Sequence, residues 1–444
     1  MKAPRLRLAY VTAGAAGMYC GSCMRDNTLA TALHQLGHDC VLVPTYTPIR
    51  TDETDVSTRR VFLGGISVYL EEQYPWLRRM PGWLSRALSQ RWLLRLASRM
   101  AVNTQAEDLV GLTLSMLRGP RGHQARELER LADWLRSHVQ PDVVLLTNVL
   151  LSGLVPVLRE RLGCPIVPLL QGDDIFLDAL PDAARQQAIA LIQANCADLP
   201  LFLASSQYYA DFMPGYLGLP ASALRVVYPG INLNGFPERQ REDQSPTLRI
   251  GYLARIAPEK GLHVLVEALG HLAKQPDLPP WEFAAAGYLA PNRQGYLDEQ
   301  RQRAMKAGWG GRFRYAGEPD HAGKIAFLSS LDLFSVPATY HEPKGIYLLE
   351  ALACGVPVVQ PRHGAFPEIV DATQGGILVE PDRPEALAEG LRPLMLDVER
   401  RKRCGESGQI AVRTRFTAQS MAEATLDALG AVLPGRWPLM GSPA

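Results

Sequence analysis

Residues 337–359 read PATYHEPKGIYLLEALACGVPVV, which predicts a loop, a helix, a tight turn and a buried strand. The helix can begin near Ile346, because Gly345 keeps the preceding segment irregular and nothing breaks the pattern before Gly355. Its residues are apolar on nearly every side, and such a helix is buried. Glu350 is therefore a charge inside a buried helix, which is costly unless a ligand or another group hydrogen-bonds it.

Glu342 lies in the loop that leads into this helix, eight residues before Glu350. Eight helical residues span roughly 12 Å, so we expect that the two carboxylates do not meet. This separation argues against a glycosidase pair, whose carboxyls lie roughly 5–10 Å apart. Two carboxylates flanking a helix N-terminus suit a long ligand with hydroxyls at both ends and an anion between them, which the amides of Gly345 and Ile346 would meet. A nucleotide diphosphate sugar has this layout; the alternative is a capping glutamate and an unrelated surface glutamate.

Length and composition restrict the class of protein. A chain of 444 residues predicts two or three domains, and a formal net charge of +1 indicates neither nucleic acid nor a general anionic surface as partner. No apolar run approaches the length of a membrane-spanning helix, and the N-terminus leads directly into a predicted strand, so we expect a cytoplasmic protein. Seven scattered cysteines argue against a disulfide framework.

Short apolar runs alternate with helical patterns through the first half of the chain. Strands are predicted at 6–12, 40–43, 143–147, 165–170, 200–204 and 225–228. Helices are predicted at 24–36, 150–162, 181–197 and 207–217. This alternation predicts a parallel sheet with both faces covered by helices.

A glycine-rich loop, residues 13–17, follows the first predicted strand. Only Gly14 and Gly17 of a three-glycine dinucleotide fingerprint are present, and no acidic residue ends the next strand, so binding of NAD is disfavoured. We interpret the glycines as allowing the loop to approach another ligand. Cys20 and Cys23 follow closely, and we interpret them as small residues of a crowded loop rather than as a reactive thiol pair.

Two further segments of the first half are candidates for binding an acceptor. Gln171, Asp173 and Asp174 follow the carboxyl end of a strand, where open α/β sheets bind ligands, although the acids can equally cap a turn. Residues 74–99 hold six arginines and three tryptophans without an acid. Such a segment can contact the inner face of a membrane or an anionic acceptor, but a solvated helix packed on the sheet is favoured.

The second half repeats the α/β pattern after a polar segment. We assign an N-terminal domain to 1–235, a linker to 236–247 and a second domain to 248–415, with a final helix within 416–434 packing back on the first domain. Strands are predicted at 248–253, 281–286, 312–315, 331–336, 356–360 and 377–379. Arg255 and Lys260 follow the first of these strands, where two cations suit a diphosphate; the alternative is a basic helix-entry loop.

The motifs of the second half resemble the retaining glycosyltransferases of family 4, also grouped as glycosyl transferases group 1. The resemblance rests on residues 251–261 with Arg255 and Lys260, on Glu342-x7-Glu350 with Gly345, and on the segments 351–359, 366–370 and 375–381, all in the expected order. It is weaker in the first half, through residues 14–17 and 227–236.

The resemblance implies an α/β protein of GT-B architecture, with two Rossmann-like doubly wound parallel-sheet domains facing a cleft. It implies that Arg255 and Lys260 contact the donor diphosphate, that Glu342 touches the sugar hydroxyls, and that Glu350 binds the nucleotide ribose. Many members carry a histidine after the middle strand of the first domain. Here Gln171-Gly-Asp-Asp174 takes its place, so the chemistry on the acceptor side departs from the family pattern.

The sequence therefore predicts a retaining hexosyltransferase with Arg255, Lys260 and Glu342 as catalytic residues. Its donor is bound by the residues Gly14, Gly17, Gly345, Ile346 and Glu350. The expected acceptor is a saccharide, a lipid-linked molecule or a small molecule. The chain has no Asp-x-Asp element of the metal-using kind, so we expect neither metal nor cofactor. A sugar-nucleotide epimerase and a catalytically silent nucleotide-sugar-binding protein are the alternatives.

Overall fold

The computed structural model describes residues 4–14, 21–58, 60–62, 106–238 and 246–433. The described residues form two compact units, the first comprising those up to Tyr228 and those from Met421 onward, and the second comprising Pro229–Ser420. The predicted basic segment 74–99 and Gly17 lie outside the described residues. No helix in the part of the chain that is described is long and apolar enough to cross a lipid bilayer.

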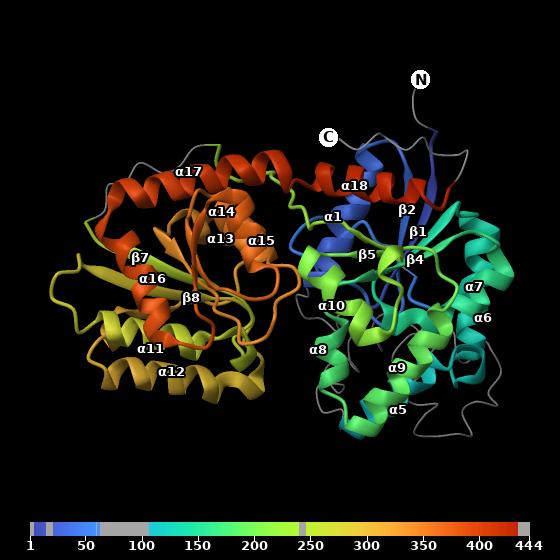
Figure 1. The fold of residues 1–444 in the computed structure, drawn as a ribbon, viewed down its shortest axis with the longest axis horizontal. Helices are drawn as coiled ribbons and strands as arrows, with labels where there is room; N and C mark the ends of the chain where they lie inside the picture. Colours follow the sequence, from blue (N-terminus) through green and yellow to red (C-terminus); the bar gives the residue numbers. More distant parts are fainter. Residues whose placement is uncertain (1–3, 15–20, 59, 63–105, 239–245, 434–444) are drawn as a thin grey trace. The chain divides into compact units, whose positions relative to one another are not determined.

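The first unit contains a six-stranded, all-parallel sheet (Figure 1). Its strands are β1 (Arg7–Thr12), β2 (Asp39–Pro44), β3 (Val143–Leu146), β4 (Ile166–Leu170), β5 (Phe202–Ala204) and β6 (Leu224–Val226), in the order β2-β1-β3-β4-β5-β6. Every residue of β3, β4 and β5 is buried, as expected of a parallel sheet that is covered on both faces. All six predicted strands are therefore confirmed, with ends that differ by at most two residues.

Helices cover the first sheet. They are α1 (Gly21–Gln35), α5 (Ala106–Leu117), α6 (Ala125–Trp134), α7 (Val155–Leu162), α8 (Asp173–Asp178), α9 (Asp182–Cys196), α10 (Gln207–Leu217) and most of α18 (Ala418–Gly430). The helix predicted over 150–162 is instead a 3-10 turn, Val149–Leu154, followed by α7. Pro156 explains the difference, since proline is accommodated in the first turn of a helix but not in its interior.

The second unit contains another six-stranded parallel sheet. Its strands are β7 (Leu248–Leu253), β8 (Trp281–Ala286), β9 (Phe313–Tyr315), β10 (Leu333–Phe334), β11 (Val358–Pro361) and β12 (Gly376–Val379), in the order β12-β11-β10-β7-β8-β9. The strand predicted at 331–336 is shortened to β10, because Ala338 donates its N–H to the carbonyl of Val336 at 2.8 Å and turns the chain.

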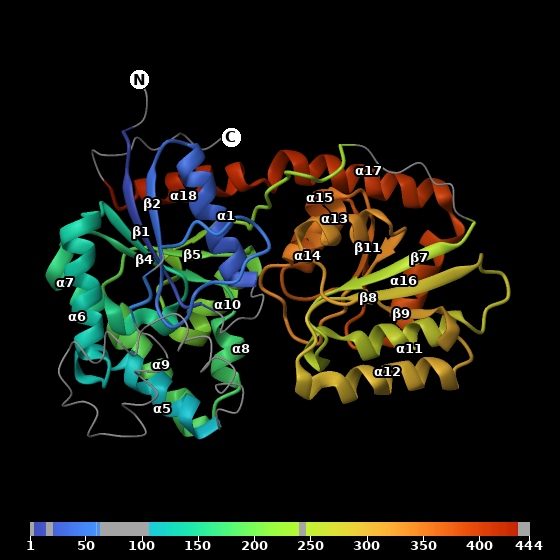
Figure 2. The same cartoon turned by 180° about the vertical axis from the view of Figure 1, so that it is seen from behind.

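The second sheet also lies between two helical layers (Figures 1 and 2). The helices are α11 (Leu262–Leu272), α12 (Gln294–Lys306), α13 (His321–Ser329), α14 (Ile346–Ala353), α15 (Phe366–Thr373), α16 (Pro384–Leu396) and α17 (Val398–Arg415). α11 packs against α12 and α16 on one face, and α14 packs against α13 and α17 on the other.

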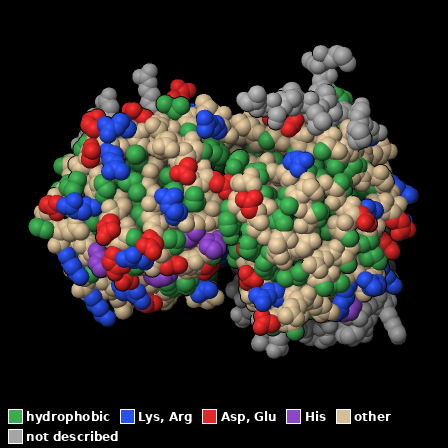
Figure 3. Space-filling model, viewed as in Figure 1, with side chains coloured by type: hydrophobic (Ala, Val, Ile, Leu, Met, Phe, Trp, Pro, Cys, Tyr) green, Lys and Arg blue, Asp and Glu red, His purple; other side chains and the backbone are tan. Residues whose placement is uncertain are grey.

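Each sheet has a position where the strand order reverses. In the first unit it lies between β1 and β3, and in the second unit between β7 and β10. Open α/β sheets bind ligands at the carboxyl ends of the strands beside this position. The loops that follow these four strands are therefore where the functional side chains are expected. On the molecular face shown in Figure 3, acidic and basic side chains are interspersed, in keeping with the small net charge.

Candidate functional site

The loop after β7 packs closely against the loop after β10. Gly261 has a φ of 71°, and a Cβ at this position would lie 1.7 Å from the carbonyl oxygen of Pro337, so glycine is required there. Thr339 donates its N–H to the carbonyl of Glu259 at 3.1 Å, which links the same two loops. Arg255 contacts Glu259 at 3.3 Å and is 44% exposed. The packing of these loops places Lys260 beside Glu342.

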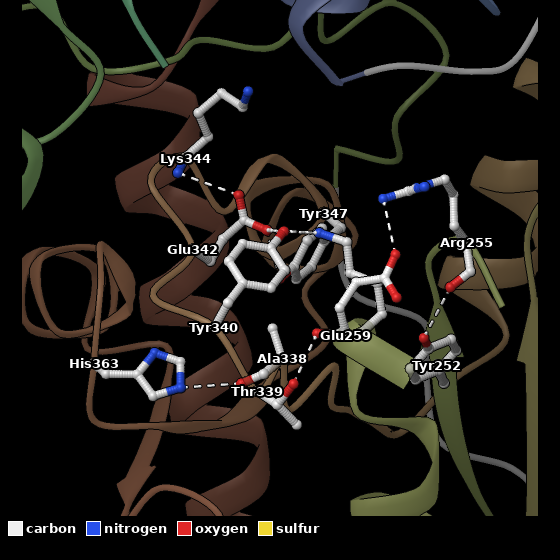
Figure 4. Close-up of polar contacts among 11 residues, drawn as sticks. Tyr252, Arg255, Glu259, Ala338, Thr339, Tyr340, Glu342, Lys344, Tyr347 and His363 are labelled. Carbon is white, nitrogen blue, oxygen red and sulfur yellow. Dashed lines mark hydrogen bonds and ion pairs between the residues drawn. The ribbon is translucent and has the colours of Figure 1, made fainter. Parts of the chain in front are cut away.

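Lys260 and Glu342 form a nearly buried ion pair, with 2.7 Å between Nζ and Oε2 and side-chain exposures of 12% and 5%. Tyr340 and Tyr347 donate their hydroxyl groups to the same carboxylate oxygen at 2.6 and 3.3 Å (Figure 4). Lys260 also donates to the Tyr340 hydroxyl, and its Nζ lies 4.8 and 5.2 Å from the centroids of the two rings. The four residues form one hydrogen-bonded cluster at the carboxyl end of the sheet.

The cluster favours an ionised Glu342. Burial by itself raises the pKa of this carboxyl, but the charges of Lys260 and then Lys344, with the hydrogen bonds, lower the pKa from 4.5 to about 2. Burial, followed by the charge of Glu342, raises the pKa of Tyr340 well above 10, and the pKa of Tyr347 is raised in the same way. At neutral pH both phenols therefore remain protonated and can donate.

This shift predicts a pH-dependent contribution to stability. The folded-state pKa of Glu342 lies below its ordinary value, so its contribution is present above about pH 4.5 and is lost as the pH falls toward 2. The expected loss is on the order of 3 kcal/mol. Urea unfolding of the wild type and of Glu342→Gln between pH 2 and 7 measures it. The variant should be less stable at pH 7 and should lose less free energy of unfolding on acidification; parallel curves would contradict the assignment.

A third loop contacts the backbone of Glu342. Gly364 has a φ of 58°, and a Cβ there would lie 2.5 Å from the carbonyl oxygen of Glu342. Ala365 donates its N–H to that carbonyl at 2.8 Å, and His363 contacts the carbonyl of Ala338 through Nε2 at 3.0 Å. The backbone of the Glu342 loop is thus held by the segment after β11.

Helix α14 begins at Ile346, as the sequence predicts, and ends at Ala353, shortly before Gly355. Its N-cap is Gly345, with a φ of 65°. Glu350 is buried, and it accepts a hydrogen bond from Lys324 of α13 at 2.5 Å between Nζ and Oε1, both side chains being at most 10% exposed. The predicted buried charge therefore has a partner within the chain. Glu342 and Glu350 belong to separate ion pairs, as expected for carboxylates that do not meet.

A second polar cluster lies in the first unit, at the ends of β1, β3 and β4. Asp26 of α1 is fully buried and accepts hydrogen bonds from Thr12 at 2.7 Å, from Thr147 at 2.5 Å and from Tyr10. Gln171 donates to Asp26 at 3.3 Å and to the carbonyl of Thr147 at 2.7 Å. Asp26 was not among the residues predicted from the sequence, in which nothing distinguishes it from a surface acid.

The two acids that follow Gln171 both make contacts within the fold. Asp173 accepts the N–H groups of Gln171 at 3.0 Å and Val149 at 2.9 Å, and Asp174 accepts the hydroxyl of Tyr209 at 2.5 Å. The contact between Asp173 and Gln171 is of the local kind that a turn cap makes, whereas the contacts with Val149 and Tyr209 join separate elements of the first unit.

The structure describes part of the glycine-rich loop. Gly14 has a φ of 82°, and a Cβ there would lie 2.1 Å from the carbonyl oxygen of Thr47, so the loop passes directly over that backbone. Gly17 and Cys20 lie outside the described residues, and Cys23 is buried.

Comparison with known proteins identifies the family that the second unit resembles. Residues 237–410 match the family model described as Glycosyl transferases group 1. The chain is 29% identical to a D-inositol 3-phosphate glycosyltransferase of Corynebacterium jeikeium over 238 residues, 51% of this chain and 56% of that protein. It is 30% identical to a phosphatidyl-myo-inositol mannosyltransferase of Mycobacterium tuberculosis over 191 residues, 41% of this chain and 48% of that protein. The chain thus spans about half the length of these relatives.

The fold of this chain is shared with proteins of known structure. The match with Anabaena HepE in complex with UDP covers 96% of this chain and 100% of the HepE chain, with a TM-score of 0.64 and 16% sequence identity. The match with sucrose-phosphate synthase from Thermosynechococcus elongatus covers 95% of this chain and 97% of the synthase chain, with a TM-score of 0.67 and 17% sequence identity. The predicted α/β fold with two Rossmann-like parallel-sheet domains is therefore confirmed as that of the GT-B glycosyltransferases.

Proposed function

We propose that this chain, whose residues 237–410 match the glycosyl transferases group 1 family, is a retaining hexosyltransferase of family 4. It would move a sugar from a nucleotide diphosphate donor to an acceptor hydroxyl. The observation that carries the proposal is the cluster of Lys260, Glu342, Tyr340 and Tyr347, which lies in the second unit beside the position of strand reversal.

The donor is proposed to bind along the loops of the second unit. Arg255 and Lys260 offer cations to the diphosphate, and helix α14 begins at Ile346, where the first backbone N–H groups have no intrahelical acceptor. Glu342 accepts sugar hydroxyls, and Glu350, held by Lys324, accepts the hydroxyls of the ribose. These roles follow the family resemblance, and the ion pairs support them by holding both carboxylates in fixed positions.

Glu342 is better suited to position the sugar than to attack it. Its Oε2 atom accepts from Lys260 and two tyrosines, which compensates the negative charge, and Oε1 is the oxygen proposed to accept from sugar hydroxyls. We therefore propose attack by the acceptor hydroxyl on the same face that the diphosphate leaves. Arg255, Lys260 and the first amides of α14 would stabilise the negative charge that develops on the leaving group.

The acceptor is proposed to be held mainly by the first unit. The relatives include proteins named for inositol 3-phosphate, phosphatidyl-myo-inositol and glycogen, so saccharide, lipid-linked and small-molecule acceptors are all represented. Residues 74–99, outside the described part of the chain, are the proposed contact for an anionic or lipid-linked acceptor.

Radiolabelled UDP- and GDP-sugars test the proposed function. Transfer of label to an acceptor, or slow hydrolysis of the donor, supports a transferase. In a control with Lys260→Ala, the rate of forming either product should fall by about a hundredfold to a thousandfold. An epimerised nucleotide sugar would favour an epimerase, and binding without turnover would favour a silent binding protein.

We also expect that activity survives a chelator. The charge on a departing nucleotide diphosphate is met in enzymes either by a divalent metal or by fixed cations and amide dipoles. Arg255, Lys260 and the N-terminus of α14 supply the second kind of compensation. Initial rates in EDTA should therefore match those in buffer. Loss of turnover in EDTA that manganese restores would overturn the metal-free mechanism.

A further inference from the structure

Arg25 is a buried arginine with incomplete hydrogen bonding in helix α1 of the first unit. Its side chain is 2% exposed, and its Nη2 atom lies 3.4 Å from the carbonyl oxygen of Val227. Its Nε and Nη1 atoms are also buried, and neither has a hydrogen-bond acceptor among the described residues.

This arrangement is costly unless something else accepts from the guanidinium. Nearly all buried polar groups in native proteins have hydrogen-bond partners, and a buried group without one is destabilising, more so when it is charged. Asp26, the next residue, does not supply the acceptor. Its carboxylate accepts from Tyr10, Thr12, Thr147 and Gln171, and neither Nε nor Nη1 of Arg25 donates to it.

The position of Arg25 favours an anionic partner. Helix α1 follows β1 and begins at Gly21, at the carboxyl end of the first sheet, so its positive end and the guanidinium lie in the same region. Val227 follows β6 and donates its N–H to the carbonyl of Ala204 at 2.8 Å, which places the Arg25 contact at that same edge. Ligands of open α/β sheets bind at this edge.

We propose that Arg25 forms an oxyanion site in the first unit that takes a phosphoryl group of a substrate. Guanidinium groups recognise phosphate through several charge-assisted hydrogen bonds. A tetrahedral phosphoryl group has enough oxygens to accept from Nε and Nη1, the two nitrogens that lack an acceptor, and from the N–H groups of a helix N-terminus. The proposal goes beyond the proposed function, which assigns the donor diphosphate to the second unit.

Calorimetric titration with inorganic phosphate at fixed ionic strength tests this site. The titrations use the Lys260→Ala background, because the second unit can also bind phosphate. We expect saturable binding in this background and a Kd at least about tenfold weaker after Arg25→Gln, the effect of losing charge-assisted hydrogen bonds. Arg159→Gln is the matched control, since Arg159 is an exposed arginine of the same unit that contacts Asp198. The Arg159→Gln variant should bind phosphate with the same Kd as the Lys260→Ala background.

Stability measurements separate this site from a structural role as a counter-charge to Asp26. If Arg25 serves only as that counter-charge, Arg25→Gln should lower the urea midpoint and phosphate should leave the midpoint of every variant unchanged. If Arg25 forms an oxyanion site, phosphate should raise the midpoint only where Arg25 is present. Arg25→Lys keeps the charge and loses the planar fork, so it should fold and bind phosphate more weakly. Absence of saturable binding in the Lys260→Ala protein, or equal affinity in all Arg25 variants, would overturn the proposal.

The source of the phosphoryl group is decided by repeating the titration with saturating UDP in the wild type. Phosphate binding that persists, and still depends on Arg25, assigns the site to a phosphorylated acceptor. Loss of the Arg25-dependent binding assigns it to the donor diphosphate. Because these assays measure binding without sugar transfer, failure of this site leaves the radiolabel test of the proposed function unaffected.

Discussion

Lys260→Ala is expected to lower kcat by about a hundredfold to a thousandfold, equivalent to roughly 2.7–4 kcal/mol of lost transition-state stabilisation. The lysine is proposed to meet the charge that develops on the leaving diphosphate, and it also holds the Glu342 carboxylate at 2.7 Å. Removing it leaves that buried carboxylate with less positive charge nearby. Initial rates of transfer from a labelled donor, measured at several donor concentrations, separate the fall in kcat from any change in KM.

Two further variants show whether such a loss is chemical or structural. Lys306→Ala removes an exposed lysine of α12 and should retain the wild-type rate. Lys260→Ala combined with Glu342→Gln removes the uncompensated charge, so it should recover part of the lost stability in urea unfolding but none of the turnover. If Lys260→Ala alone folds normally and keeps more than a tenth of the wild-type kcat, that result would argue against a role of Lys260 in catalysis.

Glu350→Ala is expected to destabilise the fold by about 3–5 kcal/mol, the cost of breaking a buried ion pair. Glu350 is 7% exposed and accepts from Lys324 at 2.5 Å, so the variant removes the carboxylate beside a buried ammonium group. Because Glu350 is also proposed to bind the ribose, nucleotide affinity should fall as well. Urea unfolding measures the first effect, and titration with UDP and GDP measures the second.

The two effects of Glu350 can be separated by replacing the whole pair. Glu350→Leu with Lys324→Met substitutes apolar side chains of similar size, and such exchanges of buried ion pairs are often neutral or stabilising. The double variant should therefore approach wild-type stability while its nucleotide affinity remains low. Wild-type affinity in the double variant would show that the pair serves the fold alone.

Much of each unit was predictable because local patterns specify it. Continuous apolar runs identified buried parallel strands such as β7 and β8, whose bounds match the prediction, and all-round apolarity identified α14. Ends were less predictable where a single contact changes the path of the chain. β10 is short because of the turn at Val336, and α7 begins late because of Pro156.

Residue patterns were sufficient to predict the α/β alternation, the buried helix α14 with its one acid, and the loops that carry Arg255, Lys260 and Glu342. Which of these groups contact one another could be known from the folded chain alone. Lys324 lies 26 positions from Glu350, Lys260 lies 82 from Glu342, and Gln171 lies 145 from Asp26. Apolar periodicity reports the burial of one residue along its own element. The partner of a buried charge depends on strand order and loop packing, which place residues at the same sheet edge whatever their separation in the chain.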